Sequence, residues 1–164
     1  MRLWQKNTIP TEEIDRFTVG HDRELDVMLA KWDALGSMAH VTMLHSIGLI
    51  DDDELPCLLA ELKNIVREAE EGRFVIEDGI EDVHSQVELT LTRKLGDMGK
   101  KIHAGRSRND QVLLDLKLFA RDGIRRVAEA VKKLSDELLA KSEEYKDVVM
   151  PGYTHLQVAM PSSF

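Results

Sequence analysis

Residues 109–146 contain no proline and a single interior glycine, Gly123, and their apolar residues recur at steps of three and four. This period places apolar side chains along one face of an α-helix. The stripe consists of Leu113, Leu116, Ala120, Ile124, Val127, Val131, Leu134 and Leu138. At 1.5 Å per residue the helix would be about 55 Å long, beyond the roughly 30 Å width of a compact domain of this size. We therefore expect it to pack along other long helices, from further sequence or from other subunits.

Two shorter helices are predicted ahead of it, each with an apolar face and a glycine at its end. The first covers about 23–47 and ends at Gly48; its expected inward residues are Leu25, Met28, Leu29, Trp32, Leu35, Ala39, Met43 and Ile47. The second follows the acidic run 51–54, which suits a helix N-terminus, and ends at Gly72. Its expected inward residues are Leu55, Leu58, Leu59, Leu62, Ile65, Val66 and Ala69.

A third helix is predicted from about 80 to 95, ending at Gly96, with Ile80, Val83, Val87, Leu91 and Leu95 directed inward. The basic, glycine-bearing stretch between 96 and 106 is predicted to be a loop. Glycines and prolines are few, 10 and 4, and aromatic residues make up 5%, which favours helices over sheets. We predict an all-α fold with a helical domain over residues 1–108, followed by the long helix and a turn over 109–164.

Composition excludes several classes of partner. The net charge of −8 disfavours nucleic acid, whose phosphates need a basic face. The chain has no apolar run long enough to span a membrane and no hydrophobic signal core at its start, so we expect a cytoplasmic protein. Cys57 is the single cysteine, which excludes a disulfide framework within the chain, and its helical surroundings predict a buried thiol.

One local basic segment stands out in this acidic chain, since residues 100–108 hold Lys100, Lys101, His103, Arg106 and Arg108 and no carboxylate. It indicates either a site for an anionic small molecule or a solvated loop. Residues 103–112 read HAGRSRNDQV and lie at the predicted start of the long helix. Ser107, Asn109 and Asp110 can cap that helix, and its first N–H groups favour anions. Arg106 and Arg108 add planar guanidinium groups suited to carboxylates. The segment is either a site for an anionic small molecule or a helix cap with arginines facing solvent.

A second polar segment, residues 81–88, reads EDVHSQVE. His84 and Glu88 are one helical turn apart, the spacing of half a metal site. No second histidine at ligand spacing accompanies them, so we expect a structural pair on the helix and no metal.

The third segment is the last part of the chain, residues 150–164. A turn containing Gly152 is predicted to present Thr154 and His155, and Pro161 lies where a further helix would start. Threonine can donate to a carboxylate and histidine titrates near neutrality, although a loop histidine without a catalytic role fits the same pattern. A helix that stops after its first turn predicts that the 164 residues as a whole are the N-terminal piece of a longer protein.

Taken together, HAGRSRNDQV and the later PGYTHLQVAMP resemble two of the three signature regions of the fumarase/aspartase superfamily. Within it, GRSRNDQV is the version found in the argininosuccinate lyase family, and EDVHSQVE is similar to another segment of that family. The resemblance implies a bundle of long helices, of which the chain would hold the truncated start. It also implies a homotetramer that assembles each active site from three subunits.

The same resemblance implies the reversible anti β-elimination of argininosuccinate to arginine and fumarate, without a cofactor. Residue by residue, it implies that Ser107, Arg108 and Asn109 hold the substrate and that Thr154 binds a carboxylate. His155 would be the catalytic histidine, acting as acid or as activator of the base. His84 would contact the substrate or support residues that do.

The chain departs from the family pattern in two places. The serine that the family carries near its N-terminus has no clear counterpart in residues 17–22, where Thr18 is the candidate. The third signature region, a flexible loop with the catalytic serine, is absent from the sequence. We therefore expect the 164 residues to be inactive alone. Another fumarate-releasing lyase, or a non-catalytic crystallin-like helical relative, remains the alternative.

Overall fold

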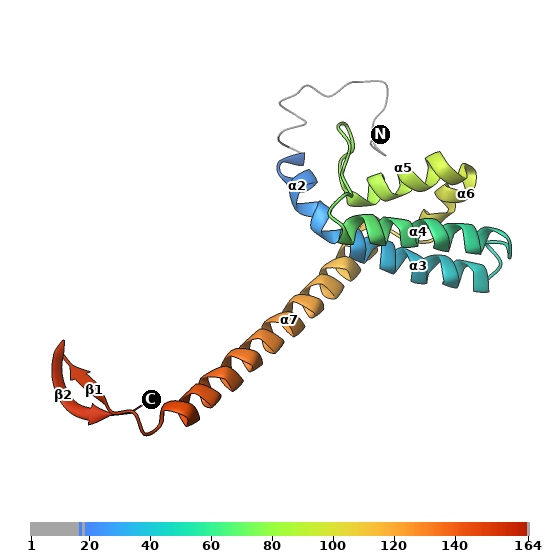
Figure 1. Cartoon of the computed structure of the whole chain (residues 1–164). Coiled ribbons are helices and arrows are strands. Elements are labelled where there is room, and N and C mark those ends of the chain that lie inside the picture. The colour runs from blue at the N-terminus through green and yellow to red at the C-terminus, as the bar shows by residue number, and fades with distance from the viewer. Residues whose placement is uncertain (1–16, 18, 164) are drawn as a thin grey trace. The chain divides into compact units, whose positions relative to one another are not determined.

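The computed structural model describes residue 17 and residues 19–163, which form two compact units divided between Phe119 and Ala120, within the longest helix. Nearly all elements are helical, which confirms the predicted class (Figure 1). In chain order they are α2 (Asp22–Asp26), η1 (Val27–Leu29), α3 (Ala30–Ser46), α4 (Glu54–Glu70), α5 (Val83–Leu95), α6 (Asp97–Lys100), η2 (Lys101–His103), α7 (Arg108–Tyr145), β1 (Met150–Thr154) and β2 (Gln157–Ser162).

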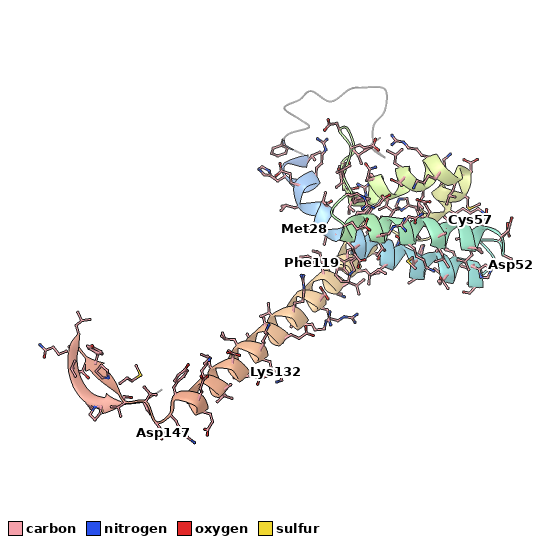
Figure 2. All side chains as sticks on the ribbon, in the orientation of Figure 1. Met28, Asp52, Cys57, Phe119, Lys132 and Asp147 are labelled. Carbon is pink, nitrogen blue, oxygen red and sulfur yellow. The ribbon has the colours of Figure 1, made fainter. Side chains whose placement is uncertain are left out.

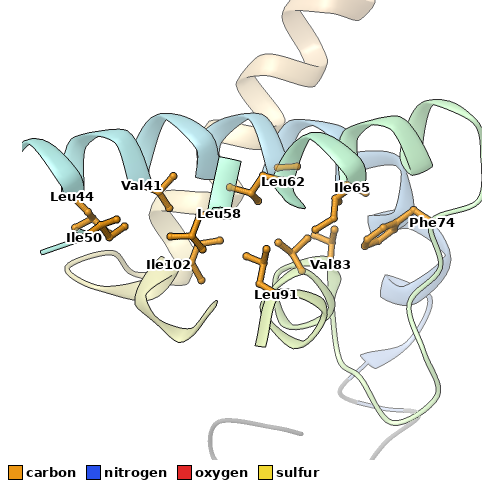
Figure 3. Close-up of a cluster of buried hydrophobic side chains, with 13 residues drawn as sticks. Val41, Leu44, Ile50, Leu58, Leu62, Ile65, Phe74, Val83, Leu91 and Ile102 are labelled. Atoms are coloured by element: carbon orange, nitrogen blue, oxygen red, sulfur yellow. The ribbon is translucent and has the colours of Figure 1, made fainter. Parts of the chain in front are cut away.

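The core of the first unit lies between the hairpin of α3 and α4 and the shorter helices α5 and α6 (Figure 3). The predicted inward faces of α4 and α5 are confirmed, since Leu58, Leu62 and Ile65 of α4 pack against Val83, Val87 and Leu91 of α5. Each of these six side chains is at most 1% exposed. α5 begins at Val83 rather than at 80 because the carboxylate of Asp82 accepts a hydrogen bond from Ser85 N at 2.8 Å and caps the helix.

The predicted inward face of α3 is wrong. Its buried side is formed by smaller residues, among them Ala30, Ala34, Ser37 and Val41. The large residues of the predicted stripe, Leu25, Met28, Leu35, Met43 and Ile47, are 36% to 61% exposed in the described chain. Both sets recur at helical spacing, so periodicity alone could not distinguish them. Small residues allow neighbours to approach closely: a Cβ added at Gly36 would lie 2.8 Å from Leu114 Cδ2 of α7.

The segment between 96 and 106 is partly helical, and the predicted loop is wrong there, because α6 and η2 occupy residues 97–103. Gly96 and Gly105 take positive φ angles, as glycines in turns do, whereas Gly99 serves a different purpose. A Cβ at Gly99 would lie 2.5 Å from the backbone carbon of Leu91, so this glycine allows α6 to lie against the end of α5. Cys57 is exposed on α4, contrary to the expected buried thiol (Figure 2).

The second unit contains the later part of α7 and a β-hairpin. Along α7, Ile124, Val127, Val131, Leu134 and Leu138 are 56% to 70% exposed in the described chain. Figure 2 shows the side chains of this part of α7, where Lys132 is labelled. Throughout the described residues, no helix has both the length and the apolar character to cross a membrane.

The hairpin corrects the prediction of a helix start at Pro161. β1 and β2 pair antiparallel, and Pro161 lies in β2 opposite Pro151. Proline has no N–H and a fixed φ, so it fits a pair position that needs no ladder donor as well as a first helical turn. His155 and Leu156 have φ angles of 47° and 64°, as the two central residues of a type I′ turn require.

We predict opposite effects for two alanine substitutions. Gly99→Ala would force a Cβ against the backbone of α5 and lower the free energy of unfolding by about 1 to 3 kcal/mol. Gly123→Ala would place a Cβ in open space within α7 and raise helix stability by about 0.5 to 1 kcal/mol. Denaturant unfolding followed by circular dichroism measures both; a Gly99→Ala chain as stable as the unsubstituted one would contradict the close approach.

We also predict that the 164-residue chain self-associates through the exposed stripe of α7. Val131→Glu should shift the sedimentation equilibrium toward the monomer, because it buries a charge in any interface that covers the stripe. Ala140→Glu is the matched control, since nine residues, or two and a half turns, separate the two positions and place Ala140 on the opposite side of the helix. A monomeric unsubstituted chain, or equal effects of the two variants, would contradict this prediction.

Candidate functional site

The start of α7 presents two of the predicted substrate-binding residues. Asp110 stabilises this start, because its Oδ2 accepts a hydrogen bond from Ser107 N at 2.9 Å while Asp110 N donates to Ser107 O at 3.1 Å. Ser107 and Asn109 are exposed, and within the described residues neither the Ser107 hydroxyl nor the Asn109 amide has a hydrogen-bond partner. The helix start therefore offers free side-chain donors beside unpaired backbone N–H groups.

Arg108 lies between these two residues, but its guanidinium is engaged within the protein. Nη1 lies 2.6 Å from Asp82 Oδ2 and 3.8 Å from Glu81 Oε2. Nη2 donates to Ser85 Oγ at 2.9 Å. The three partners come from the start of α5 and the residues just before it, so Arg108 joins the starts of α5 and α7.

His84 is buried, and it does not pair with Glu88. Its Nδ1 lies 2.8 Å from Asp33 Oδ1 of α3 and 3.7 Å from Asp115 Oδ2 of α7, whereas Glu88 pairs with His103 at 2.9 Å. The predicted pair of His84 and Glu88 on the helix is therefore wrong. Burial lowers the pKa of His84, but the hydrogen bond with Asp33 and the charges of Asp33, Asp82 and Asp115 raise it more, so it lies above its ordinary value.

Asp33, Gln111 and Asp115 complete this cluster, and sequence reasoning missed all three. Gln111 Nε2 donates to Asp33 Oδ1 at 3.1 Å. Burial and the charge of Asp33 raise the pKa of Asp115 to about 7. Asp33 Oδ2 and Asp115 Oδ2 are buried and have no donor in the described residues. A proton retained on Asp115 and shared with Asp33 would satisfy both oxygens at once.

Asp33, His84 and Asp115 also have the spacing of metal ligands, since one ligand atom from each lies within 4.8 Å of the others. Arg106 already supplies positive charge here. Burial lowers the pKa of Arg106, while the charges of Asp33 and Asp115 raise it, and Nη2 donates to Ser37 Oγ of α3 at 3.1 Å. A guanidinium beside two carboxylates does what a cation would do, so the chemistry of the cluster fits a polar core better than a metal site.

Thr154 and His155 lie in the second unit, at the end of β1 and in the turn of the hairpin. His155 is exposed and its positive φ is fixed by the type I′ turn, a conformation that non-glycine residues seldom adopt. The first unit thus holds Ser107, Arg108 and Asn109 at the start of α7 and His84 in the buried cluster, and the second unit holds Thr154 and His155. The remaining candidate, Thr18, lies outside the described residues.

The raised pKa of Asp115 predicts how stability depends on pH. Because the folded protein holds this proton to higher pH than the unfolded chain, the stabilisation is complete below about pH 4 and is lost as the pH rises through about 7. In Asp115→Asn the amide keeps a donor for Asp33 at every pH. The free energy of unfolding of the variant, relative to that of the unsubstituted chain, should therefore increase between pH 4 and 8 by more than about 1.4 kcal/mol, which corresponds to one pKa unit. Denaturant unfolding at each pH measures it, with Asp78→Asn in an exposed loop as control; equal pH profiles would contradict it.

This chain is similar in sequence to several known proteins. It is 71% identical over 163 residues to the argininosuccinate lyase of Phocaeicola vulgatus and 68% identical over 163 residues to that of Bacteroides fragilis. Each match covers 99% of this chain and 36% of the relative. The argininosuccinate lyase of Thiobacillus denitrificans is 42% identical over 154 residues, 94% of this chain and 33% of the relative.

The chain therefore spans about a third of the length of these relatives, and the resemblance predicted from its motifs is confirmed. A family model described as Lyase matches residues 15–164. Because this match covers most of the sequence, the chain belongs to the Lyase family.

Proposed function

We propose that this chain is part of an argininosuccinate lyase, which converts argininosuccinate to arginine and fumarate by a reversible anti β-elimination. The identity of 71% over 163 residues to a protein of that name supports the proposal. Since the chain spans 36% of that protein, the activity belongs to the whole protein of which these residues form a part. The observation that carries the site is the pair of exposed donors at the start of α7, Ser107 and Asn109, whose side chains have no hydrogen-bond partner among the described residues.

The reaction explains why such donors are needed. A base removes the proton from the carbon next to a substrate carboxylate, and the negative charge passes into that carboxylate as a doubly charged aci-carboxylate. The C–N bond then breaks, its electron pair leaves with the guanidinium nitrogen, and an acid protonates that nitrogen. Donors already directed at the developing charge stabilise it without reorganisation, and the positive end of α7 adds to their field.

Thr154 and His155 would serve the other half of the reaction. The Thr154 hydroxyl would donate to a substrate carboxylate, and the His155 imidazole would act as acid or as activator of the base. A tight turn suits this task because Thr154 is held in β1 by its pairing with Gln157, and His155 is fixed in φ as the first central residue of the turn. His84 would support the site from inside the protein, since its ring is buried against Asp33.

The proposal extends to assembly and organisation. We propose a cytoplasmic homotetramer without a cofactor, in which residues 1–108 form a helical domain and residues 109–164 begin a bundle of long helices. The exposed apolar stripe of α7 supports such packing, because five large side chains on one helix face are more than half exposed in the described chain.

A full-length chimaera tests the activity. This chain would replace the 163 matched residues of the Phocaeicola vulgatus enzyme, and the appearance of fumarate from argininosuccinate would be followed. We predict turnover by the chimaera and none by the 164 residues alone. Conversion of adenylosuccinate, malate or aspartate instead would favour a sibling lyase, and a correctly folded but inactive chimaera would favour a non-catalytic relative.

In the same chimaera, His155→Asn should lower kcat by about 10² to 10⁴, the usual contribution of a general acid or base, with the fold retained. His45→Asn is the control, because His45 lies at the end of α3, where its Nε2 pairs with exposed Asp52. Unchanged kinetics of the His155 variant would remove this residue from the mechanism.

A further inference from the structure

The carboxylate of Asp82 serves two helices at once. Its Oδ1 accepts a hydrogen bond from Ser85 N at 2.8 Å and so caps the start of α5. Its Oδ2 lies 2.6 Å from Nη1 of Arg108, the first residue of α7. This carboxylate therefore links the starts of α5 and α7.

Both terminal nitrogens of the Arg108 guanidinium are engaged in this arrangement. Nη1 is bound to Asp82 and also faces Glu81, whose Oε2 is buried and has no other partner in the described residues. Nη2 donates to Ser85 Oγ. A substrate carboxylate that approached Arg108 would therefore meet the negative charge of two carboxylates as well as the positive charge of one guanidinium, which leaves little net attraction.

We propose that Asp82 is a positioning residue of the lyase site and that it acts through Arg108, which holds the first turn of α7 instead of binding the substrate. This inference rests on the proposed function. Ser107 and Asn109 flank Arg108 in the chain and carry the free donors, so fixing the Arg108 side chain against α5 fixes the backbone from which both neighbours project.

A second set of contacts, farther along α7 than Arg108, also holds the start of this helix in position. Gln111 and Asp115 of α7 reach the buried cluster, where Asp33 bonds to both Gln111 and His84 of α5. The start of α7 is thus held at Arg108 by Asp82, and at Gln111 and Asp115 by the buried cluster. Loss of the contact between Asp82 and Arg108 should tilt or loosen the first turn, while the contacts with the buried cluster keep the helix in place.

A double-mutant cycle distinguishes two groups that act through one shared contact from two groups that act independently. If Asp82 and Arg108 contribute only through their pair, loss of either removes the whole contribution, and the double variant loses nothing more. If Arg108 bound the substrate directly, Asp82→Asn would release its guanidinium and improve or preserve binding, whereas Arg108→Gln would weaken it.

The first experiment uses the 164-residue chain and requires no activity. Asp82→Asn keeps an oxygen that can cap α5 and removes the charge that holds Arg108. Amide hydrogen exchange of Asp110 and Gln111, whose N–H groups bond to Ser107 O, reports on the first turn of α7. We expect exchange to be roughly tenfold faster, and equally so in Asp82→Asn, Arg108→Gln and the double variant. A tenfold change corresponds to about 1.4 kcal/mol in the free energy of opening the first turn. Exchange that the substitutions leave unchanged would overturn the proposal.

Asp97→Asn is the matched control for this experiment. Asp97 is an exposed carboxylate in the first turn of α6 that pairs with Lys100 at 2.7 Å, so the same chemical change is made away from α7. We expect the control to leave exchange at Asp110 and Gln111 unaltered.

The second experiment measures kcat and KM of the full-length chimaera. Each single variant and the double variant should lose a similar factor in kcat/KM, on the order of a hundredfold, as misplaced binding groups do. The unfolding midpoint should change little, which separates positioning from loss of the fold. Additive losses, or an Asp82→Asn enzyme with normal or lowered KM, would overturn the proposal. A chimaera without lyase activity would instead refute the proposed function, and the exchange measurement would still decide the role of Asp82.

Discussion

The fold of the first unit depends on the need to neutralise charge in a buried place. Asp33, His84 and Asp115 come from three helices and are at most 2% exposed, and Arg106 supplies further positive charge. An ionised group without a partner would cost several kcal/mol in such surroundings. These groups satisfy one another only in one arrangement of the three helices. The cluster therefore adds to the close packing of the apolar core in fixing the register of α3, α5 and α7.

This arrangement places the proposed substrate-binding side chains at the exposed start of α7, a helix that the buried cluster holds in position. On the proposed function, the side chains of Ser107 and Asn109 donate to the substrate, so these two side chains cannot also hold α7 in place. The neighbouring residues take that part instead: Arg108 through Asp82, and Asp110 through Ser107 N. Alternate residues of one short segment thus divide into those that hold the helix and those that remain available to a ligand, and both kinds are necessary for a preorganised site.

The accuracy of the sequence predictions follows from how local each feature is. The bounds of α4 and α7 and the end of α5 could be predicted because caps, glycines and apolar periods act within a few residues. The start of α5 was predicted at 80, ahead of its observed start at Val83. The buried face of α3 could not, because its small residues recur at the same period as its large ones and only the neighbouring helices decide between them. The hairpin was missed because Pro161 fits a strand as well as a helix start. Asp33 and Asp115 were missed because their partner, His84, lies far away in sequence, although a polar residue within an apolar helix face is a usable sign.

The exposed apolar side chains lead to a final point about the energetics of assembly. The five large residues Leu25, Met28, Leu35, Met43 and Ile47, and the five of the α7 stripe from Ile124 to Leu138, remain between 36% and 70% exposed in the described chain. Complete burial of such a side chain contributes about 1.5 to 3 kcal/mol, so completing their burial offers on the order of 10 kcal/mol. Association costs roughly 4 to 15 kcal/mol in lost freedom, so burial of one such face is close to balance and burial of several faces is favourable. A bundle in which each α7 contacts more than one neighbour would thus be stable where a simple pair of chains is marginal, which is consistent with the proposed tetramer.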